Sequence, residues 1–267
     1  MKKILFSLMA LFLPLYAQSI KAGYDVSFGI IGEIGKADIT YTHVGDAYTI
    51  YVHAWTTGTA AMFTQNREED YISQGRIVEG VLRPDAFVKH RKNDNHTKSS
   101  VFIFDHENSK VSLDTTRQNN VQGTAFDIKT MKNMKTETER FTHETEMFRF
   151  FTDNDLLSLF FNTQKIFPTL NDGDSKTLAA IGSKSPNCEI DIEVPTKETR
   201  QKLQAVMTES EGRILTIVLH QNIFQSERGE LHVIFDEDGF AEDVLLKDVI
   251  LFGDIRGKRI YQELSSN

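Results

Sequence analysis

Histidine side chains are the first candidates for chemistry in this sequence, because an imidazole can bind a metal or transfer a proton near neutral pH. His90 and His96 lie six residues apart in a polar segment, where two imidazoles could share a metal ion. Arg91 and Lys92 follow His90 directly, and their positive charges oppose the binding of a cation. The sequence therefore does not favour a metal site here.

The other histidines lack the partners that catalysis needs. His53 shares a predicted strand face with Tyr51 and Trp55, which is typical of a hydrogen-bonded packing residue. His220 and His232 lie on late predicted strands, with no visible serine or cysteine partner. Carboxylates are plentiful but adjacent in sequence, whereas acid–base catalysis needs two carboxyl groups across a cleft. We expect a protein that is not an enzyme and has no catalytic residues.

Loop motifs that bind phosphate or calcium are incomplete. Gly29, Gly32 and Gly35 are three residues apart, unlike the G-x-G-x-x-G spacing of a dinucleotide-binding loop. Asp236 and Asp238 begin a turn that resembles part of a calcium loop, but later ligands of such a loop are missing. No Walker-type, H-E-x-x-H or G-x-S-x-G motif occurs. We expect no cofactor and no bound metal.

Cys188 is the only cysteine of the sequence, so no intramolecular disulfide can form. It directly precedes a predicted strand and has no histidine nearby. We interpret it as a partly buried small residue and not as a nucleophile.

The aromatic side chains are candidates for ligand binding, because the sequence contains 19 phenylalanines. Some of them could line an apolar cavity for an acyl chain. Alternatively, they fill the core between a sheet and a helix, since closely packed interiors are the rule. The aromatic residues considered for a cavity are Tyr51, Trp55, Phe63, Phe148, Phe150, Phe151, Phe160 and Phe161. The predicted ligand-binding residues among them are Tyr51, Trp55, Phe63, Phe151, Phe160 and Phe161.

A strongly apolar helix is predicted from Asp155 to Phe167. Its apolar side chains cover most of the circumference instead of one stripe, which is typical of a buried helix. Thr152 is the expected N-cap, with Asp155 three residues later as a shorter equivalent of the capping-box glutamate. Pro168 ends the helix. A protein rich in β-structure can bury such a helix by curving a sheet around it.

Most of the remaining chain shows the period-two alternation of β-strands. The clearest example is 46–56, in which the two faces carry different side chains. The predicted strands cover 24–29, 35–42, 46–56, 70–78, 81–89, 99–105, 110–114, 175–181, 189–194, 213–221, 230–235 and 241–252. A single helical turn is predicted over 58–63 and a modest surface helix over 196–207. Short turns between successive strands imply antiparallel pairing.

The segment 115–146 is polar and poor in aliphatic residues, and two interpretations stay open: long solvated hairpin strands or a mobile excursion. No composition break, linker or internal repeat divides the chain, so we predict a single β-rich domain over 18–267. The predicted fold class is mainly β (α+β). It comprises a curved antiparallel sheet or half-barrel wrapped around one buried helix, with a short second helix.

Residues 1–17 have the features of a secretory signal peptide. Two lysines precede an almost wholly apolar run over 4–16, and cleavage is expected after Ala17, with Ala22 as the second choice. The run is shorter than the about 20 residues that span a bilayer, although an N-terminal anchor helix remains the alternative. No second long apolar stretch occurs, so we expect no transmembrane segment in the mature chain. The expected location is the periplasm.

The charge balance argues against a nucleic-acid partner. The chain has 38 acidic and 30 basic residues, a formal net charge of −8. Removing the two lysines of the signal peptide lowers this by two, to −10. Nucleic acids and anionic lipid surfaces both attract positive charge, so an acidic protein binds them poorly.

The order of these features resembles a bacterial envelope family, the domain of unknown function DUF3108. The residues that carry the resemblance are Tyr24-Asp25-Val26-Ser27-Phe28-Gly29, Gly35-Lys36-Ala37, the strand 48–57 with Gly58, Leu82-Arg83-Pro84, Asp155-Leu156-Leu157-Ser158-Leu159-Phe160, Gly229-Glu230-Leu231 and Asp238-Gly239. The resemblance covers most of the mature chain. It implies a secreted, β-rich protein and supplies no catalytic residues. Such proteins look like the half-barrel lipoprotein carriers of the periplasm, but fold alone does not assign function.

Together these features predict a non-catalytic periplasmic envelope protein that binds an apolar ligand, such as a lipid or a lipoprotein acyl chain. The alternative is a structural or protein-interaction module of the cell envelope with a filled core, which contacts an envelope protein through polar hairpins or sheet edges. A cavity above about 300 Å³ lined by the named aromatics would favour the first, and a closed core the second. A hydrolase would need a histidine that converges with a carboxylate or serine in a cleft.

Overall fold

The computed structural model describes residues 17–127, 132–166, 170–183, 186–207, 212–220, 229–249 and 253–266. In these residues all strands belong to one antiparallel sheet of fourteen strands. The strands are β1 (Ala17–Phe28), β2 (Gly32–Val44), β3 (Ala47–Thr56), β4 (Glu68–Val78), β5 (Val81–Lys92), β6 (His96–Asp105), β7 (Lys110–Asp127), β8 (Lys132–Phe148), β9 (Ser175–Ala179), β10 (Glu189–Glu193), β11 (Arg213–Val218), β12 (Glu230–Phe235), β13 (Ala241–Val249) and β14 (Gly253–Ser266).

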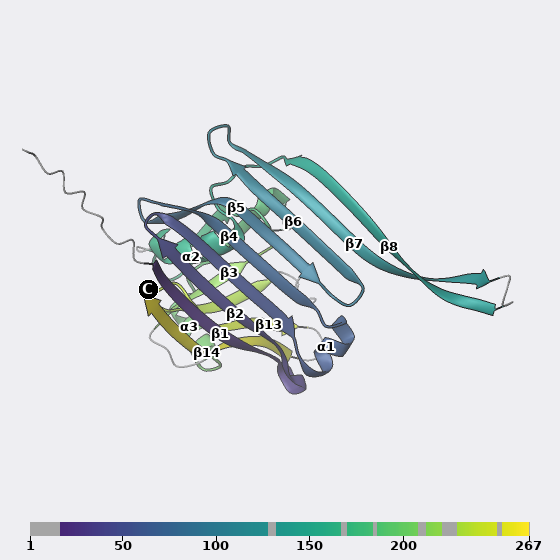
Figure 1. Ribbon diagram of the computed structural model, residues 1–267. Coiled ribbons are helices and arrows are strands. Elements are labelled where there is room, and N and C mark those ends of the chain that lie inside the picture. The colour runs from purple at the N-terminus through teal and green to yellow at the C-terminus, as the bar shows by residue number, and fades with distance from the viewer. Residues whose placement is uncertain are drawn as a thin grey trace, which may run out of the picture.

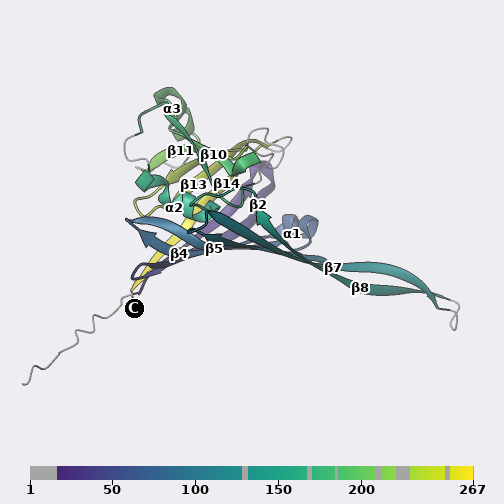
Figure 2. The same cartoon turned by 90° about the horizontal axis from the view of Figure 1, so that it is seen from above.

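The sheet consists of two meanders that meet in its middle. Strands β1 to β8 pair in chain order, strands β9 to β14 do the same, and β14 pairs with β1. The sheet does not close, because within the described residues β8 and β9 form its two edges. Figures 1 and 2 show that the β9–β14 half curves over the β1–β8 half. The predicted curved antiparallel sheet is thereby confirmed.

Helix α2 (Leu156–Ile166) lies between the two halves of the sheet (Figure 2). Leu159 is fully buried among side chains of β10 to β12, whereas Leu157 packs against side chains of the β1–β8 half. Because apolar residues on opposite sides of the helix contact opposite halves of the sheet, α2 supplies the centre of the core. The predicted burial of this helix is confirmed.

The N-cap of α2 differs from the prediction. Asp155 caps the helix, since its Oδ1 accepts hydrogen bonds from the backbone N–H groups of Leu157 at 2.7 Å and Ser158 at 2.9 Å. Ser158 Oγ in turn accepts from the Asp155 N–H, which completes a reciprocal box. The predicted cap, Thr152, instead donates to the carbonyl of Ala179. The prediction was wrong because Thr152 is used to hold the preceding loop against β9.

Two further helices occur in the described residues. Helix α1 (Gly58–Thr64) confirms the predicted helical turn, and α3 (Lys197–Gln204) lies within the predicted surface helix. Short 3-10 turns cover Gly29–Ile31 and Pro186–Cys188. The predicted helix end at Phe167 and Pro168 lies outside the described residues, as do residues 1–16 of the predicted signal peptide.

The polar segment forms a long hairpin, so the first of its two interpretations holds. Strands β7 and β8 pair from Val111 with Phe148 out to Asp127 with Lys132, and the hairpin extends well beyond the sheet (Figure 1). At the C-terminus the structure adds β14, which no prediction covered. Its sequence is rich in charged residues, and it is a strand because it completes the sheet between β1 and β13.

Candidate functional site

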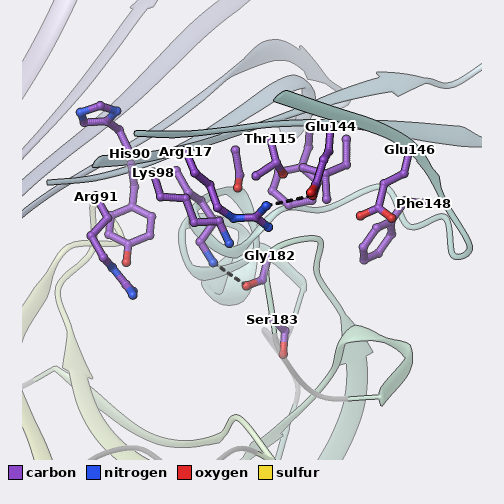
Figure 3. A pocket seen from close by; sticks show the side chains of 15 residues that line it. His90, Arg91, Lys98, Thr115, Arg117, Glu144, Glu146, Phe148, Gly182 and Ser183 are labelled. Carbon is purple, nitrogen blue, oxygen red and sulfur yellow. Dashed lines mark hydrogen bonds and ion pairs between the residues drawn. The ribbon is translucent and has the colours of Figure 1, made fainter. Parts of the chain in front are cut away.

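A cleft of about 360 Å³ lies on the concave face of the sheet, where β4 to β8 face the loop after β9. Figure 3 shows side chains that point from the strands toward this loop. The lining residues are Tyr71, Lys89, His90, Arg91, Lys98, Ser100, Phe102, Leu113, Thr115, Arg117, Glu144, Glu146, Phe148, Gly182 and Ser183.

Three cationic residues on neighbouring strands lie side by side across the cleft. Arg91 on β5 is paired with Lys98 on β6, and Lys98 is paired with Arg117 on β7. We call Arg91, Lys98 and Arg117 the cationic row. Like charges directly opposite each other in a sheet are destabilising. This arrangement therefore has a local electrostatic cost that anionic groups nearby would lower.

Carboxylates partner the two ends of the cationic row. The Arg91 Nε donates to Glu69 at 2.8 Å, and Arg117 donates to Glu144 at 2.9 Å. Burial by itself would raise the pKa of Glu69, but the Tyr71 hydroxyl and the neighbouring guanidinium groups hold this pKa below its usual value. Glu69 is therefore anionic at neutral pH and neutralises the Arg91 end of the row.

A polar band follows the cationic row along the strands. Lys89 Nζ donates to the carbonyl of Gly182 at 2.9 Å and lies 5.9 Å from the centre of the Tyr71 ring. In register with Lys89 are Ser100 and, one strand further, Thr115, both of which are buried. This contact of Lys89 brings the Gly182 loop against the sheet and closes one side of the cleft.

Apolar side chains line one end of the cleft. Phe102 on β6 is buried and paired with Leu113 on β7. The Phe148 ring meets the Phe102 ring edge-on, with centroids 5.9 Å apart. We call Phe102, Leu113 and Phe148 the apolar floor. Along β5, β6 and β7 the cleft thus changes from cationic through polar to apolar, whereas β8 places the carboxylates Glu144 and Glu146 beside the polar band and the apolar floor.

The charges that line the cleft do not cancel. Four cationic side chains, Lys89 and the cationic row, face three carboxylates, Glu144 and Glu146 in the lining and Glu69 beside Arg91, which leaves an excess of one positive charge. His90 is not counted, because its ring lies on the other side of the strand (Figure 3). The protein as a whole has a net charge of −8, so the cleft is a local positive region on an acidic molecule.

A second cleft of about 250 Å³ lies near the other end of α2. Phe161 stacks on Tyr41 with centroids 5.4 Å apart and meets Phe240 edge-on at 5.1 Å. Its lining residues are Gln18, Ile20, Tyr41, His43, Leu82, Phe161, Asn162, Lys165, Glu237 and Asp238.

The six predicted ligand-binding residues do not come together in the structure. Tyr51 and Trp55 lie on the convex face, where the Tyr51 hydroxyl donates to Asp70 at 2.7 Å. Phe63 is 85% exposed on α1. The remaining three, Phe151, Phe160 and Phe161, pack into separate parts of the core, and of the six only Phe161 lines either cleft.

The larger cleft includes Phe148 from the wider set of aromatics, but its cations were missed. The predicted strand 81–89 ends at Lys89, and Arg91 lies two residues beyond it, at the alternation that places both on the same face when the strand continues. That alternation is a sequence signal for a charged strand face. Lys98 preceded the predicted strand, and Arg117 fell in the polar segment that was left open, so their alignment with Arg91 depends on the register.

The histidines have packing partners. His53 Nδ1 lies 2.8 Å from Asp70 Oδ1, and its ring stacks on Trp55 at 5.0 Å, as the packing interpretation predicted. His220 Nε2 lies 2.7 Å from Asp191 Oδ2. In the part of the chain that the structure describes, no three histidine, cysteine or acidic side chains are grouped as metal ligands.

Cys188 is buried, with 3% of its surface exposed, and burial raises the pKa of its thiol. The buried position agrees with its interpretation as a small packing residue. Among the described helices, none combines the length and apolar character needed to cross a membrane.

Comparison with known proteins gives a family and a distant structural match. No curated protein matches the chain. Among solved structures, the crystal structure of a β-barrel-like protein of domain of unknown function DUF1849 from Brucella abortus is similar at 9% identity and a TM-score of 0.33. The match covers 94% of this chain and 98% of that one. The family model of the proteins of unknown function DUF3108 matches residues 23–239, and the chain belongs to this family.

Proposed function

We propose that this protein is a non-enzymatic periplasmic protein that holds the apolar chain of a lipid or lipoprotein in the concave cleft of its sheet. The observation that carries the proposal is a cleft of about 360 Å³ with an apolar floor. This volume lies at the lower end of the range for small-molecule sites. Its floor, Phe102 and Leu113 with Phe148, offers the chain an apolar surface beside α2.

Binding would follow from burial of apolar surface. Removal of apolar area from water contributes about 25 cal/mol per Å², from which the cost of ordering the chain is subtracted. No bond to the ligand is made or broken, so the function needs neither a nucleophile nor a metal.

Native mass spectrometry of the protein purified from its own cell envelope tests the proposal. We expect a co-purified lipid that is lost in Leu113→Gln, because this change places an amide in the apolar floor. Ile103→Gln is the matched control, since Ile103 is 47% exposed and lies beyond the cleft lining. Lipid-free protein from the native envelope, or equal occupancy in both variants, would contradict the proposal.

The proposed location is tested separately. We expect the protein in the periplasmic fraction, and N-terminal sequencing of the mature chain should begin at Gln18. A chain that retains residues 1–17 in the membrane fraction would favour the anchor helix instead.

The second candidate function is a protein-interaction module, and the long hairpin favours it. Strand β6 pairs with β7 only as far as Asn119, whereas β7 and β8 pair with each other out to Asp127. The outer hairpin is therefore a two-stranded ribbon, which is marginally stable in water without a partner surface. Replacing residues 120–139 by a short turn would abolish such a contact while leaving lipid binding in the cleft intact.

A further inference from the structure

We propose that the ligand of the concave cleft is an anionic amphiphile, whose acidic head group binds the cationic row while its chain lies on the apolar floor. This inference rests on the proposed function and adds the charge and orientation of the ligand. Both carboxylate and phosphate head groups have the required chemistry, because either accepts charge-assisted hydrogen bonds from arginine and lysine.

The first argument is electrostatic. Lys98 lies in register between Arg91 and Arg117, so three positive charges adjoin on three consecutive strands. The cleft keeps an excess of one positive charge after Glu69, Glu144 and Glu146 are counted. An anion placed over Lys98 would lower the repulsion within the row and satisfy the excess.

The second argument is the direction of the polarity change. Lys98 and Phe102 lie four residues apart on β6, which corresponds to about 13 Å along a strand. Ser100 lies between them on the same face. An extended amphiphile that follows β6 would meet cations at one end and aromatic rings at the other.

The third argument concerns where the anion comes from. The net charge of −8 repels an anionic membrane surface, whereas the positive cleft is confined to the concave face. A single amphiphile that enters the cleft is compatible with both facts. The protein is therefore expected to bind individual anionic molecules without binding anionic vesicles.

Isothermal titration calorimetry of the mature chain provides the test. The probes are dodecanoate, dodecyl phosphate, dodecanol, dodecyltrimethylammonium and inorganic phosphate. The three ionic dodecyl compounds are used below their critical micelle concentrations. We expect both dodecyl anions to bind at least tenfold more tightly than dodecanol, and dodecyltrimethylammonium to bind no better than dodecanol. Inorganic phosphate should bind at least tenfold more weakly than dodecyl phosphate, because it lacks the chain.

Variants locate the head group. Lys98→Gln should weaken dodecanoate binding about tenfold and leave dodecanol binding unchanged. Lys110→Gln removes the same charge at an exposed position that is paired with Asp105 and lies outside the cleft lining, and should change neither affinity. Thermal unfolding of both variants confirms that they are folded. Raising the salt concentration should weaken binding of dodecanoate but not of dodecanol.

The possible failures are distinguishable. Equal affinities for dodecanoate and dodecanol would overturn the anionic head group and leave the proposed function intact. Equal affinities for inorganic phosphate and dodecyl phosphate would overturn the inference that the ligand is an amphiphile, because the chain would then contribute nothing to binding. If none of the dodecyl compounds binds, the proposed function fails together with this inference.

Discussion

Ser73 on β4 donates a hydrogen bond of 2.6 Å from its Oγ to Asp155 Oδ2 at the N-terminus of α2, and both side chains are fully buried. The Tyr48 hydroxyl lies 3.0 Å from the same Ser73 Oγ. A buried polar chain thus joins β3, β4 and the first turn of the central helix. Because a buried polar group without a partner is costly, this chain fixes where α2 begins on the sheet.

The buried carboxyl of Asp155 predicts a pH dependence of stability. Burial is the main cause that raises its pKa to about 6, despite its hydrogen bonds. In the unfolded chain the value is about 3.9, so between pH 4 and 6 the folded state binds more protons than the unfolded state. The contribution of Asp155 to stability is therefore most favourable below pH 4 and declines by roughly 3 kcal/mol as the pH rises through 6.

Asp155→Asn isolates this contribution, because the amide keeps the cap geometry and does not titrate in this range. Urea unfolding at pH 4, 5, 6 and 7.5 should show the variant gaining stability relative to the wild type as the pH rises. A stability difference that stays constant over this range would contradict the raised pKa.

Truncation of the Asn162 side chain should strongly lower the free energy of unfolding. Its side-chain amide accepts from the backbone N–H of Leu82 at 2.8 Å and donates to the Leu82 carbonyl at 2.8 Å, and all these groups are buried. Asn162→Ala should cost about 2 to 4 kcal/mol, because two buried backbone groups lose their partner. The control Asn108→Ala, at an exposed amide that donates to Asp105, should cost under about 1 kcal/mol by urea unfolding.

Loss of Arg256 alone should destabilise the fold more than loss of both charges of its ion pair with Asp243. Asp243 is fully buried, and the Arg256 guanidinium contacts both of its carboxylate oxygens. Arg256→Met should destabilise the fold by about 3 kcal/mol, since the buried carboxylate loses its counter-charge. Adding Asp243→Asn should restore part of this loss. If the double variant is no more stable than Arg256→Met, the buried charge is not the cause.

Adding a side chain at Gly75 should cause a steric clash where the register between β4 and β5 is irregular. A Cβ at this position would lie 2.1 Å from the carbonyl oxygen of Arg83, a backbone atom that cannot swing away. Gly75→Ala should therefore cost about 1 to 3 kcal/mol. At Gly257 a Cβ would meet Val244 at an ordinary 3.7 Å, so Gly257→Ala should change the unfolding midpoint little. Equal midpoint shifts would contradict the close approach of the two strands.

Some of the fold follows from local pattern. The alternation within β3 predicts a strand with two different faces, and the apolar run of α2 predicts a buried helix. The alternation did not reveal which face of the strand lies inside the protein. Tyr48 and Ile50 face α2, whereas Tyr51 is 38% exposed, because the direction of sheet curvature depends on the whole sheet.

The candidate site depends on pairing between distant strands. Arg91, Lys98 and Arg117 come together only because β5, β6 and β7 pair in one register, and a shift by one residue would send one member to the opposite face. The helix cap shows the same limit. Thr152 and Asp155 both suit an N-cap locally, and the choice was made by Ser73, which lies 82 residues away from Asp155.

The strand periodicity and the central apolar helix can be predicted from local sequence pattern, because both arise from contacts between near neighbours. The inward face of the sheet, the cap of α2 and the alignment of the cationic row are set by contacts across the folded sheet. These depend on hydrogen bonds and strand registers between segments far apart in the chain, whose free energies become available only once the sheet has curved around the helix.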